Sequence, residues 1–154
     1  IAVTKDIIIE DTDKFIKASP SNDFSVDLVV EFDHPAIGKQ SCFLDEKSVS
    51  FRYDISKART FGFKHEIEYL TKNGLARGGS LKNAILIDEN GVVNPEGLRY
   101  DNEFARHKML DFVGDIFLAG YNFKADFKTF KSGHDINNKF LHKLFNDEEN
   151  YRIL

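Results

Sequence analysis

Apolar residues recur at every second position over residues 24–32. They are Phe24, Val26, Leu28, Val30 and Phe32, and Ser25, Asp27 and Glu31 lie among the residues between them. A period of two is typical of a strand with one buried face, so a strand is predicted here, ending at Asp33-His34-Pro35. A β-branched run over residues 3–10 predicts an earlier strand.

Residues 49–58 fit two periodicities. Val49, Phe51, Tyr53 and Ile55 alternate as in a strand, whereas Phe51, Ile55 and Ala58 lie at helical spacing. We favour a helix for this segment.

Residues 64–73 predict a short helix. Ile67 and Leu70 lie within it, one helical turn apart, among good helix formers. Gly74 follows at the position where a left-handed cap is expected.

A hairpin is predicted next. Residues 84–87 and 92–93 are apolar and flank Glu89-Asn90-Gly91. Because Asn-Gly tolerates the positive φ that hairpin turns require, the segment is interpreted as a strand, a tight turn and a strand.

The longest helix is predicted over residues 102–120. Its core stripe has the spacing i, i+3, i+4, i+7 and i+8 and consists of Met109, Phe112, Val113, Ile116 and Phe117. A strand is expected at residues 123–130. The final helix is marked by Ile136, Phe140, Leu141 and Leu144.

These elements follow one another without a regular strand–helix–strand rhythm. The predicted fold class is therefore α+β, a two-layer sandwich in which helices pack on one face of a mostly antiparallel sheet. No internal repeat, low-complexity tract or linker divides the sequence, so residues 1–154 are treated as one domain.

Composition narrows the function. The 154 residues include 21 Lys+Arg and 25 Asp+Glu, a formal net charge of −4, which argues against a general nucleic-acid or membrane-surface binder. The single cysteine, Cys42, cannot form an internal disulfide or a thiolate metal cage, so we expect a buried thiol in an intracellular, cytoplasmic protein. No apolar run approaches the roughly 20 residues of a membrane span. Because residue 1 is Ile and the only methionine is Met109, we expect the chain to begin inside a longer one.

One face of the long helix carries candidate metal ligands. His107 and Asp111 are four residues apart, so their side chains leave the same face at the spacing that two ligands of one metal ion need, and Asp115 continues the row. The row lies opposite the apolar stripe, and it is either a solvated polar face or a metal site. Phe104 and Leu118 flank it, which favours a covered face.

The turn Lys131-Ser132-Gly133-His134 lies between a predicted strand and a predicted helix. Gly133 would let backbone approach a ligand, and free N–H groups at the helix start would suit an anion. The alternative is an N-capping turn with an incidental histidine. The other histidines, His34, His65 and His142, have no partner at ligand spacing and are interpreted as structural or surface residues.

Five segments combine these residues with further motifs. They are ARTFGF (58–63), GLARGGS (74–80), NPEGLRY (94–100), EFARHKMLD (103–111) and KSGH (131–134). In this order they closely resemble the UDP-3-O-acyl-N-acetylglucosamine deacetylase family, the zinc amidases of bacterial lipid A synthesis. The resemblance runs over about residues 26–145 and corresponds to the second, carboxy-terminal domain of that enzyme, a small sheet with helices on one face.

The resemblance implies roles for both groups of candidates. His107 and Asp111 would be two of three zinc ligands, while the third, a histidine, and a glutamate general base would belong to the first domain, which is absent from this chain. His134 would be the second catalytic residue. Asp115 would orient it, and Thr60 would polarise the substrate carbonyl.

Further residues are implied to contact the substrate, UDP-3-O-acyl-N-acetylglucosamine. Those near the sugar or the diphosphate are Phe61, Lys108, Lys131 and Gly133. Residues 64–86 would form a small βαβ insert with a hydrophobic passage for the acyl chain. Its expected lining is Ile67, Leu75, Ala76, Leu81, Ala84 and Leu86.

Two other hypotheses stay open. Without the third ligand and the general base, the chain could be a non-catalytic module that holds the nucleotide-linked lipid or docks onto its missing half. A free-standing metal hydrolase that completes its site with His65 or His142 is the second rival, although neither histidine has the spacing.

Overall fold

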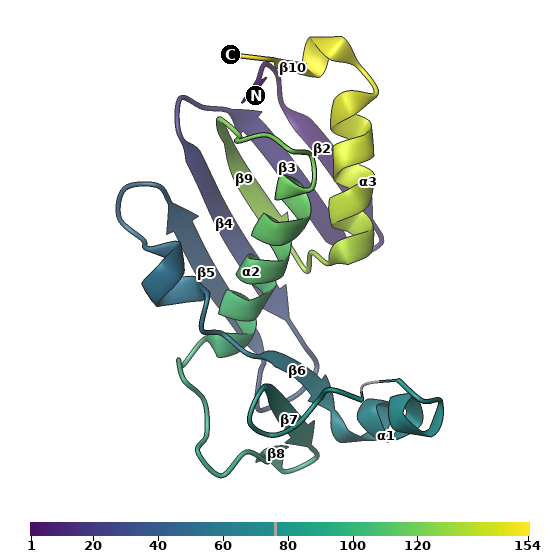
Figure 1. Cartoon of the computed structure of the whole chain (residues 1–154). Helices are drawn as coiled ribbons and strands as arrows, with labels where there is room; N and C mark the ends of the chain where they lie inside the picture. Colours follow the sequence, from purple (N-terminus) through teal and green to yellow (C-terminus); the bar gives the residue numbers. More distant parts are fainter. Residues whose placement is uncertain (76) are drawn as a thin grey trace.

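The computed structural model describes residues 1–75 and 77–154, and its centre is a five-stranded sheet (Figure 1). The strand order is β2-β3-β9-β4-β5; β9 and β4 run parallel, and the other neighbouring pairs are antiparallel. The strands are β2 (Ile7–Asp11), β3 (Lys14–Pro20), β4 (Phe24–Glu31), β5 (Lys39–Asp45) and β9 (Ala125–Phe130). A short antiparallel pair, β1 (Ala2–Val3) with β10 (Tyr151–Arg152), brings the two ends of the chain together (Figure 1).

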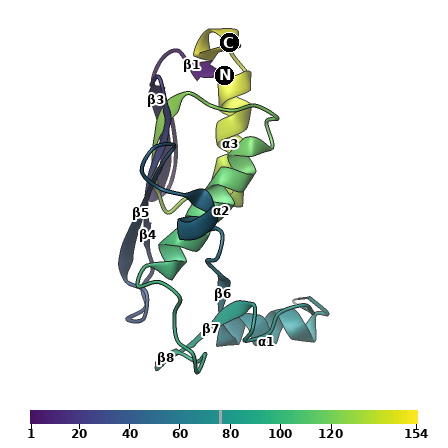
Figure 2. The same cartoon turned by 60° about the vertical axis from the view of Figure 1, so that its left-hand side comes forward.

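Two helices cover the same face of this sheet (Figure 2). They are α2 (Glu103–Phe117) and α3 (His134–Phe145). Phe127 of the central strand β9 packs between them, with ring centroids 5.4 Å from Phe112 of α2 and 5.7 Å from Phe140 of α3. The main core therefore lies between one sheet and one helical layer, as the α+β prediction required.

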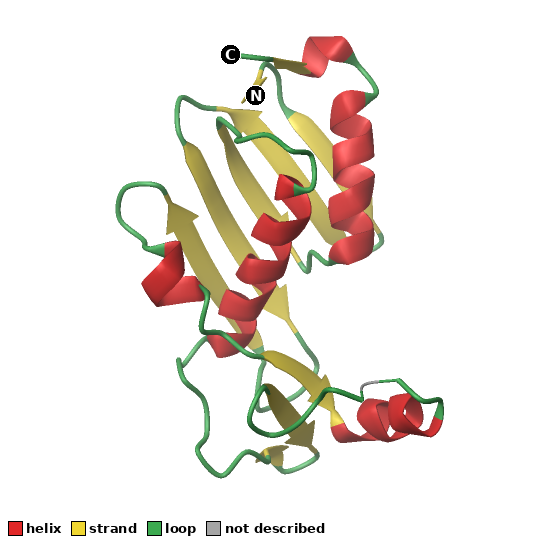
Figure 3. Cartoon of the chain, viewed as in Figure 1, coloured by secondary structure: helices red, strands yellow, loops and turns green. Residues whose placement is uncertain are grey.

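A smaller unit projects from one end of the sheet (Figure 3). It consists of β6 (Thr60–Phe63), α1 (Lys64–Lys72), β7 (Ala84–Asp88) and β8 (Gly91–Val92). β6 and β7 are parallel and β7 and β8 antiparallel, so the first three elements form the expected βαβ insert, which begins at Thr60 rather than at Lys64. A second core cluster, which includes Ile85, Ile87 and Phe104, joins this insert to the start of α2.

Most of the predicted elements are confirmed. Residues 24–31 form β4 with alternating burial, Gly74 follows α1 with φ +74°, and the hairpin turns at Gly91 with φ +134°. Within residues 49–58, Phe51–Ile55 forms one helical turn, η1, so the preference for a helix is confirmed for its centre. A 3-10 turn, η2 (Glu148–Asn150), precedes β10.

The carboxy-terminal end of the apolar stripe on α2, Phe117, was predicted wrongly. Phe117 is 41% exposed and Val113 is only partly buried, whereas Met109, Phe112 and Ile116 are fully buried. At 100° per residue, position 117 has rotated about 80° from Met109 and has left the sheet-facing side. Leu118, taken as evidence of a covered face, is 76% exposed.

Four strands were not predicted from the sequence, namely β3, β5, β6 and the two-residue β10. β3 and β5 each carry lysine and other polar residues at the outward positions and leave few buried side chains, and β6 has no fully buried residue at all. Cys42 of β5 is buried, as predicted for a small apolar thiol, and burial raises its pKa to about 11. Among the described residues, no helix combines the length and the apolar character needed to cross a bilayer.

Candidate metal and catalytic site

The predicted ligand pair lies at the wall of a cleft of about 600 Å³. His107 and Asp111 project from successive turns of α2, and their side chains are 13% and 12% exposed. The Nε2 atom of His107 lies 3.5 Å from Oδ1 of Asp111. The row is therefore a partly buried pair at a cleft rather than a solvated face.

The protonation state of His107 suits a ligand. Burial lowers the pKa of its imidazole, and this effect exceeds the opposing influence of the Asp111 carboxylate. A neutral imidazole offers a lone pair to a metal ion, whereas an imidazolium does not. Lys108 donates to the other carboxylate oxygen, with Nζ 3.0 Å from Oδ2 of Asp111, which leaves Oδ1 facing the histidine.

The spacing of the two donor atoms fits zinc. Two ligands of a tetrahedral zinc ion, each about 2.1 Å from the metal, are about 3.4 Å apart. Imidazole nitrogen and carboxylate oxygen are both common zinc ligands. Within residues 1–75 and 77–154, no group of three His, Cys, Asp or Glu side chains is placed to hold a metal. A catalytic zinc needs three protein ligands, so this pair alone would not complete such a site.

His134 lies across the same cleft at the first residue of α3. Its Nδ1 is 2.7 Å from Oδ2 of Asp115 on α2, and its side chain is 72% exposed. Because an ionised carboxylate only accepts hydrogen bonds, Nδ1 carries the proton and Nε2 is the free nitrogen of the ring. The predicted pairing of His134 with Asp115 is confirmed as a contact.

The turn before α3 brings further predicted residues to the cleft. Lys131 has φ +52°, which turns the chain out of β9, and Gly133 is the N-cap in an extended conformation. Lys131, not Gly133, is therefore the residue with left-handed backbone angles. The extended backbone at position 133 does not require a glycine. A Cβ at Gly133 would meet nothing within 4 Å, so the glycine leaves open space at the cleft wall.

Both predicted phosphate-binding lysines line the cleft, and each already has an acidic partner. Lys131 Nζ is 2.7 Å from Oδ2 of Asp13 and 3.5 Å from Oε2 of Glu31, and the hydrogen bond to Asp13 raises the lysine pKa. Lys108 is paired with Asp111. Asp13 is 118 residues away from Lys131, so no local pattern indicates that pairing.

Thr60 and Phe61 complete the cleft from the insert side. Thr60 is the exposed first residue of β6, and the Phe61 ring packs edge-on against Phe104, with centroids 4.9 Å apart. His107 also contacts the Phe61 ring, at 6.0 Å between centroids. Phe61 therefore packs between the insert and the pair His107 and Asp111 on α2.

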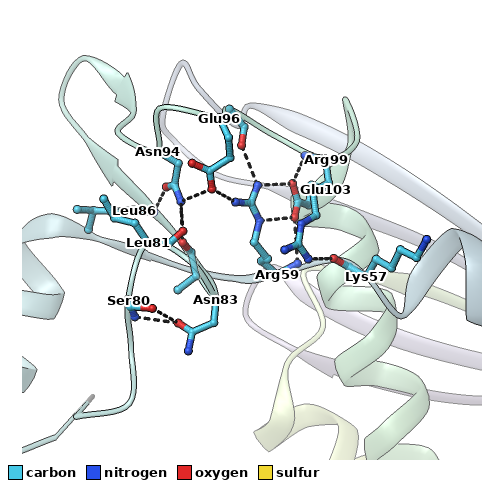
Figure 4. Close-up of polar contacts among 12 residues, drawn as sticks. Lys57, Arg59, Ser80, Leu81, Asn83, Leu86, Asn94, Glu96, Arg99 and Glu103 are labelled. Carbon is cyan, nitrogen blue, oxygen red and sulfur yellow. Dashed lines mark hydrogen bonds and ion pairs between the residues drawn. The ribbon is translucent and has the colours of Figure 1, made fainter.

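Arg59, which directly precedes Thr60 in the sequence, forms a buried ion pair with Glu103 (Figure 4). Arg59 and Glu103 have side chains that are 3% and 0% exposed, and Glu103 accepts from the Arg59 backbone N–H, from its guanidinium and from the Arg99 backbone N–H. Sequence reasoning left Arg59 without a role. The quoted motifs contain both Arg59 and Glu103, but the two residues are 44 positions apart, so no local pattern indicates that they pair.

Asn94 organises the other end of the insert (Figure 4). Its amide nitrogen donates to the carbonyls of Leu81 and Ala84, each at 2.9 Å, and its Oδ1 accepts from the Leu86 N–H at 2.8 Å. The side chain is buried, and these bonds hold the loop that leads into β7.

Beside this loop is an apolar cavity of about 230 Å³. Four of the six residues expected along the acyl passage line it, namely Ile67, Leu81, Ala84 and Leu86. Leu75 is 55% exposed and is not among the lining residues, and Ala76 lies outside the described residues.

His34, His65 and His142 are not among the residues that line the cleft. His34 is held in a turn, with Nε2 2.9 Å from the Asp88 carbonyl oxygen and Nδ1 accepting from the Ala36 N–H at 3.2 Å. His65 and His142 are exposed. Glu31, Phe32, Lys14 and Glu66 line the cleft without having been predicted as site residues.

Comparison with known proteins bears on the whole chain. Residues 1–146 match the family described as LpxC, UDP-3-O-acyl N-acetylglycosamine deacetylase. The chain belongs to this family. The match begins at residue 1, so the family resemblance includes β1, β2 and β3, which precede the motifs from which it was first inferred.

Relatives named UDP-3-O-acyl-N-acetylglucosamine deacetylase are similar over nearly all of the chain. The protein of Sulfurimonas denitrificans is 44% identical over 152 residues, which cover 99% of this chain and 52% of the relative. That of Histophilus somni is 47% identical over 156 aligned positions, 100% of this chain and 51% of the relative. That of Actinobacillus succinogenes is 48% identical over 151 residues, 97% of this chain and 50% of the relative. The chain spans about half the length of the curated relatives that it matches.

Proposed function

We propose that this chain is the carboxy-terminal half of a zinc-dependent deacetylase that removes acetate from UDP-3-O-acyl-N-acetylglucosamine in lipid A synthesis. The family and the names of the relatives support the reaction. The length of the match, about half of each relative, supports a site shared with a second, amino-terminal half. The lone buried cysteine favours the cytoplasm.

The observation that carries the proposal is the gathering of three kinds of group around one cleft. His107 and Asp111 offer a neutral nitrogen and an oxygen at zinc-ligand spacing. His134, oriented by Asp115, offers an imidazole, and Thr60 offers a hydroxyl. Amide hydrolysis needs a polarised carbonyl, an activated water and a proton for the departing amine.

Zinc, when bound to His107 and Asp111, would polarise the acetyl carbonyl and make a bound water more acidic. The Thr60 hydroxyl donates a hydrogen bond to the carbonyl oxygen as negative charge develops on it. His134 in its protonated form then gives the Nε2 proton to the amine nitrogen as the C–N bond breaks. The water oxygen becomes bonded to the acetyl carbon and its proton passes to the general base expected in the amino-terminal half, so the products are acetate and the free amine.

The two remaining parts of the substrate would lie on either side of this centre. Lys108 and Lys131 at the cleft wall would meet the diphosphate, and Phe61 and Gly133 would contact the sugar. The apolar cavity between α1 and β7 would take the acyl chain.

The test is complementation. This chain alone is expected to bind zinc weakly and to release almost no acetate from the substrate. Mixing it with the amino-terminal half of the Histophilus somni relative is expected to restore both zinc retention and acetate release. His107→Ala should abolish both in the mixture, whereas Lys128→Ala, an exposed change on the far face of β9, should abolish neither.

A non-catalytic binding module is the second candidate. It is favoured by the absence of a three-ligand cluster within residues 1–75 and 77–154. Such a module would bind the substrate or its product but would release no acetate in the mixture, even with zinc present. Acetate release that depends on His134 would eliminate it.

A further inference from the structure

Asn137 lies one turn after His134 on α3 and is 1% exposed. Its Nδ2 donates to Oδ2 of Asp115 at 2.8 Å, and the same oxygen accepts from Nδ1 of His134 at 2.7 Å. The Oδ1 of Asn137 is buried without a hydrogen-bond partner among the described residues.

The orientation of the Asn137 amide follows from the chemistry of its neighbour. An ionised carboxylate has no proton to donate, so the amide must turn its NH₂ group toward Asp115 and its carbonyl away. A buried carbonyl without a partner is unfavourable, and an apolar side chain of similar size would avoid that cost. The hydrogen bond to Asp115 is therefore the contribution that an asparagine makes at position 137 and that an apolar side chain cannot make.

The His134 ring depends on this carboxylate. It is 72% exposed, so it has little packing to fix its orientation, and Asp115 is its hydrogen-bond partner. Among the described residues, the Asp115 side chain receives hydrogen bonds from His134 and Asn137. Without Asn137, no other hydrogen bond from the described residues except that of the His134 ring itself would hold the Asp115 carboxylate in this orientation.

We propose that Asn137 is a positioning residue for His134: it anchors the Asp115 carboxylate, which holds the Nδ1–H of His134 and directs Nε2, the atom that carries the donated proton in the protonated ring, toward the substrate. This role rests on the proposed function of His134 as proton donor. Asn137 itself touches no reacting atom and acts through Asp115.

The first test needs no activity. In the ¹⁵N-labelled chain at about pH 9, where imidazoles are neutral, the ring nitrogens of His134 should report a single tautomer with the proton on Nδ1. Asn137→Leu, which keeps the volume but removes the donor, should give a mixture of tautomers. Asn138→Leu changes the exposed neighbour and should leave the His134 signals unchanged.

The second test uses the two-half enzyme. Asn137→Leu should lower kcat by about 10- to 100-fold, the usual loss when a supporting hydrogen bond of this kind is removed, and should leave KM within about twofold. An unchanged His134 tautomer in folded Asn137→Leu would overturn the inference, whatever the activity. If Asn137→Leu does not fold, Asn137→Ala takes its place, and failure of both to fold would assign Asn137 a structural role instead. Loss of acetate release in the wild-type mixture would contradict the proposed function alone, because the tautomer is measured independently.

Discussion

Arg59 and Glu103 form a buried ion pair, with Nε 2.9 Å from Oε1, between the start of β6 and the first turn of α2. Arg59 directly precedes Thr60, and Glu103 lies one helical turn before His107. One ion pair thus joins the strand that carries the Thr60 hydroxyl to the helix that carries His107, the proposed metal ligand. The relative position of the Thr60 hydroxyl and the His107 imidazole therefore depends on an ion pair whose residues do not line the cleft.

Breaking this pair should destabilise the chain. Glu103→Gln leaves the Arg59 guanidinium, 3% exposed, without its buried carboxylate partner, and we expect the free energy of unfolding to fall by about 3 kcal/mol. Urea unfolding followed by circular dichroism measures the loss. Glu96→Gln is the matched control, because Glu96 contacts the same guanidinium but is 52% exposed, and its effect should be much smaller. Equal losses in the two variants would show that burial of the pair does not matter.

Asp111 and Asp115, both on α2, should differ in whether their replacement removes the metal. In the two-half enzyme, Asp111→Asn and His107→Ala should strip zinc, because each removes a proposed ligand. Asp115→Asn should retain zinc but lower the rate of acetate release, because Asp115 contacts His134. Metal content after gel filtration gives the answer. Complete loss of zinc from Asp115→Asn would make Asp115 a ligand and would contradict its role as the partner of His134.

Cys42 gives a pH-dependent prediction. Burial raises its pKa from 9.0 to about 11, so alkylation of the folded chain should keep accelerating above pH 9, whereas in urea it should level off near pH 9. The folded state holds the thiol proton more tightly, so the corresponding contribution to stability is complete below pH 9 and is lost as pH rises from 9 to about 11. Cys42→Ala should therefore lose less stability than the wild type over that interval. A folded-state alkylation profile that levels off at pH 9 would show an exposed thiol.

In the two-half enzyme, different substitutions should affect binding of the diphosphate and binding of the acyl chain. Lys131→Ala should raise KM and make it less sensitive to salt, because a charge contact with phosphate is screened by ions. Leu86→Trp should discriminate against long acyl chains, because the added volume fills the 230 Å³ cavity. Leu75→Trp is its control, since Leu75 is exposed and outside the cavity lining.

Steady-state kinetics with a series of acyl lengths at two salt concentrations measures both effects. An unchanged chain-length profile in Leu86→Trp would assign the cavity to the core of the insert rather than to the substrate. A salt dependence of KM that Lys131→Ala leaves intact would remove Lys131 from the phosphate site.

Sequence periodicity predicted the elements that bury one regular face. β4, α2 and α3 belong to this group, because their apolar residues repeat at the period of the element. β3 and β5 were missed, since their outward residues are polar and their strand character comes from pairing with distant segments, β3 with β9 and β5 with β4. Local patterns contain no information about such partners.

In the site too, contacts between residues that are close in the sequence could be predicted, and contacts between distant residues could not. The spacing of His107 and Asp111 on one helix is local, and their proximity could be predicted from it. The bonds of His134 to Asp115, of Lys131 to Asp13 and of Arg59 to Glu103 span 19, 118 and 44 residues. The first was anticipated only through the family resemblance. The other two depend on how the sheet and the insert pack against the helices, and the sequence alone did not indicate them.

Acetate release by the mixture of this chain with an amino-terminal half tests the central claim most directly. The account predicts negligible release by the chain alone, release in the mixture with zinc retained, and loss of both when the chain carries His107→Ala. Full turnover by the chain alone, with its mass of 17.6 kDa confirmed, would contradict a site divided between two halves.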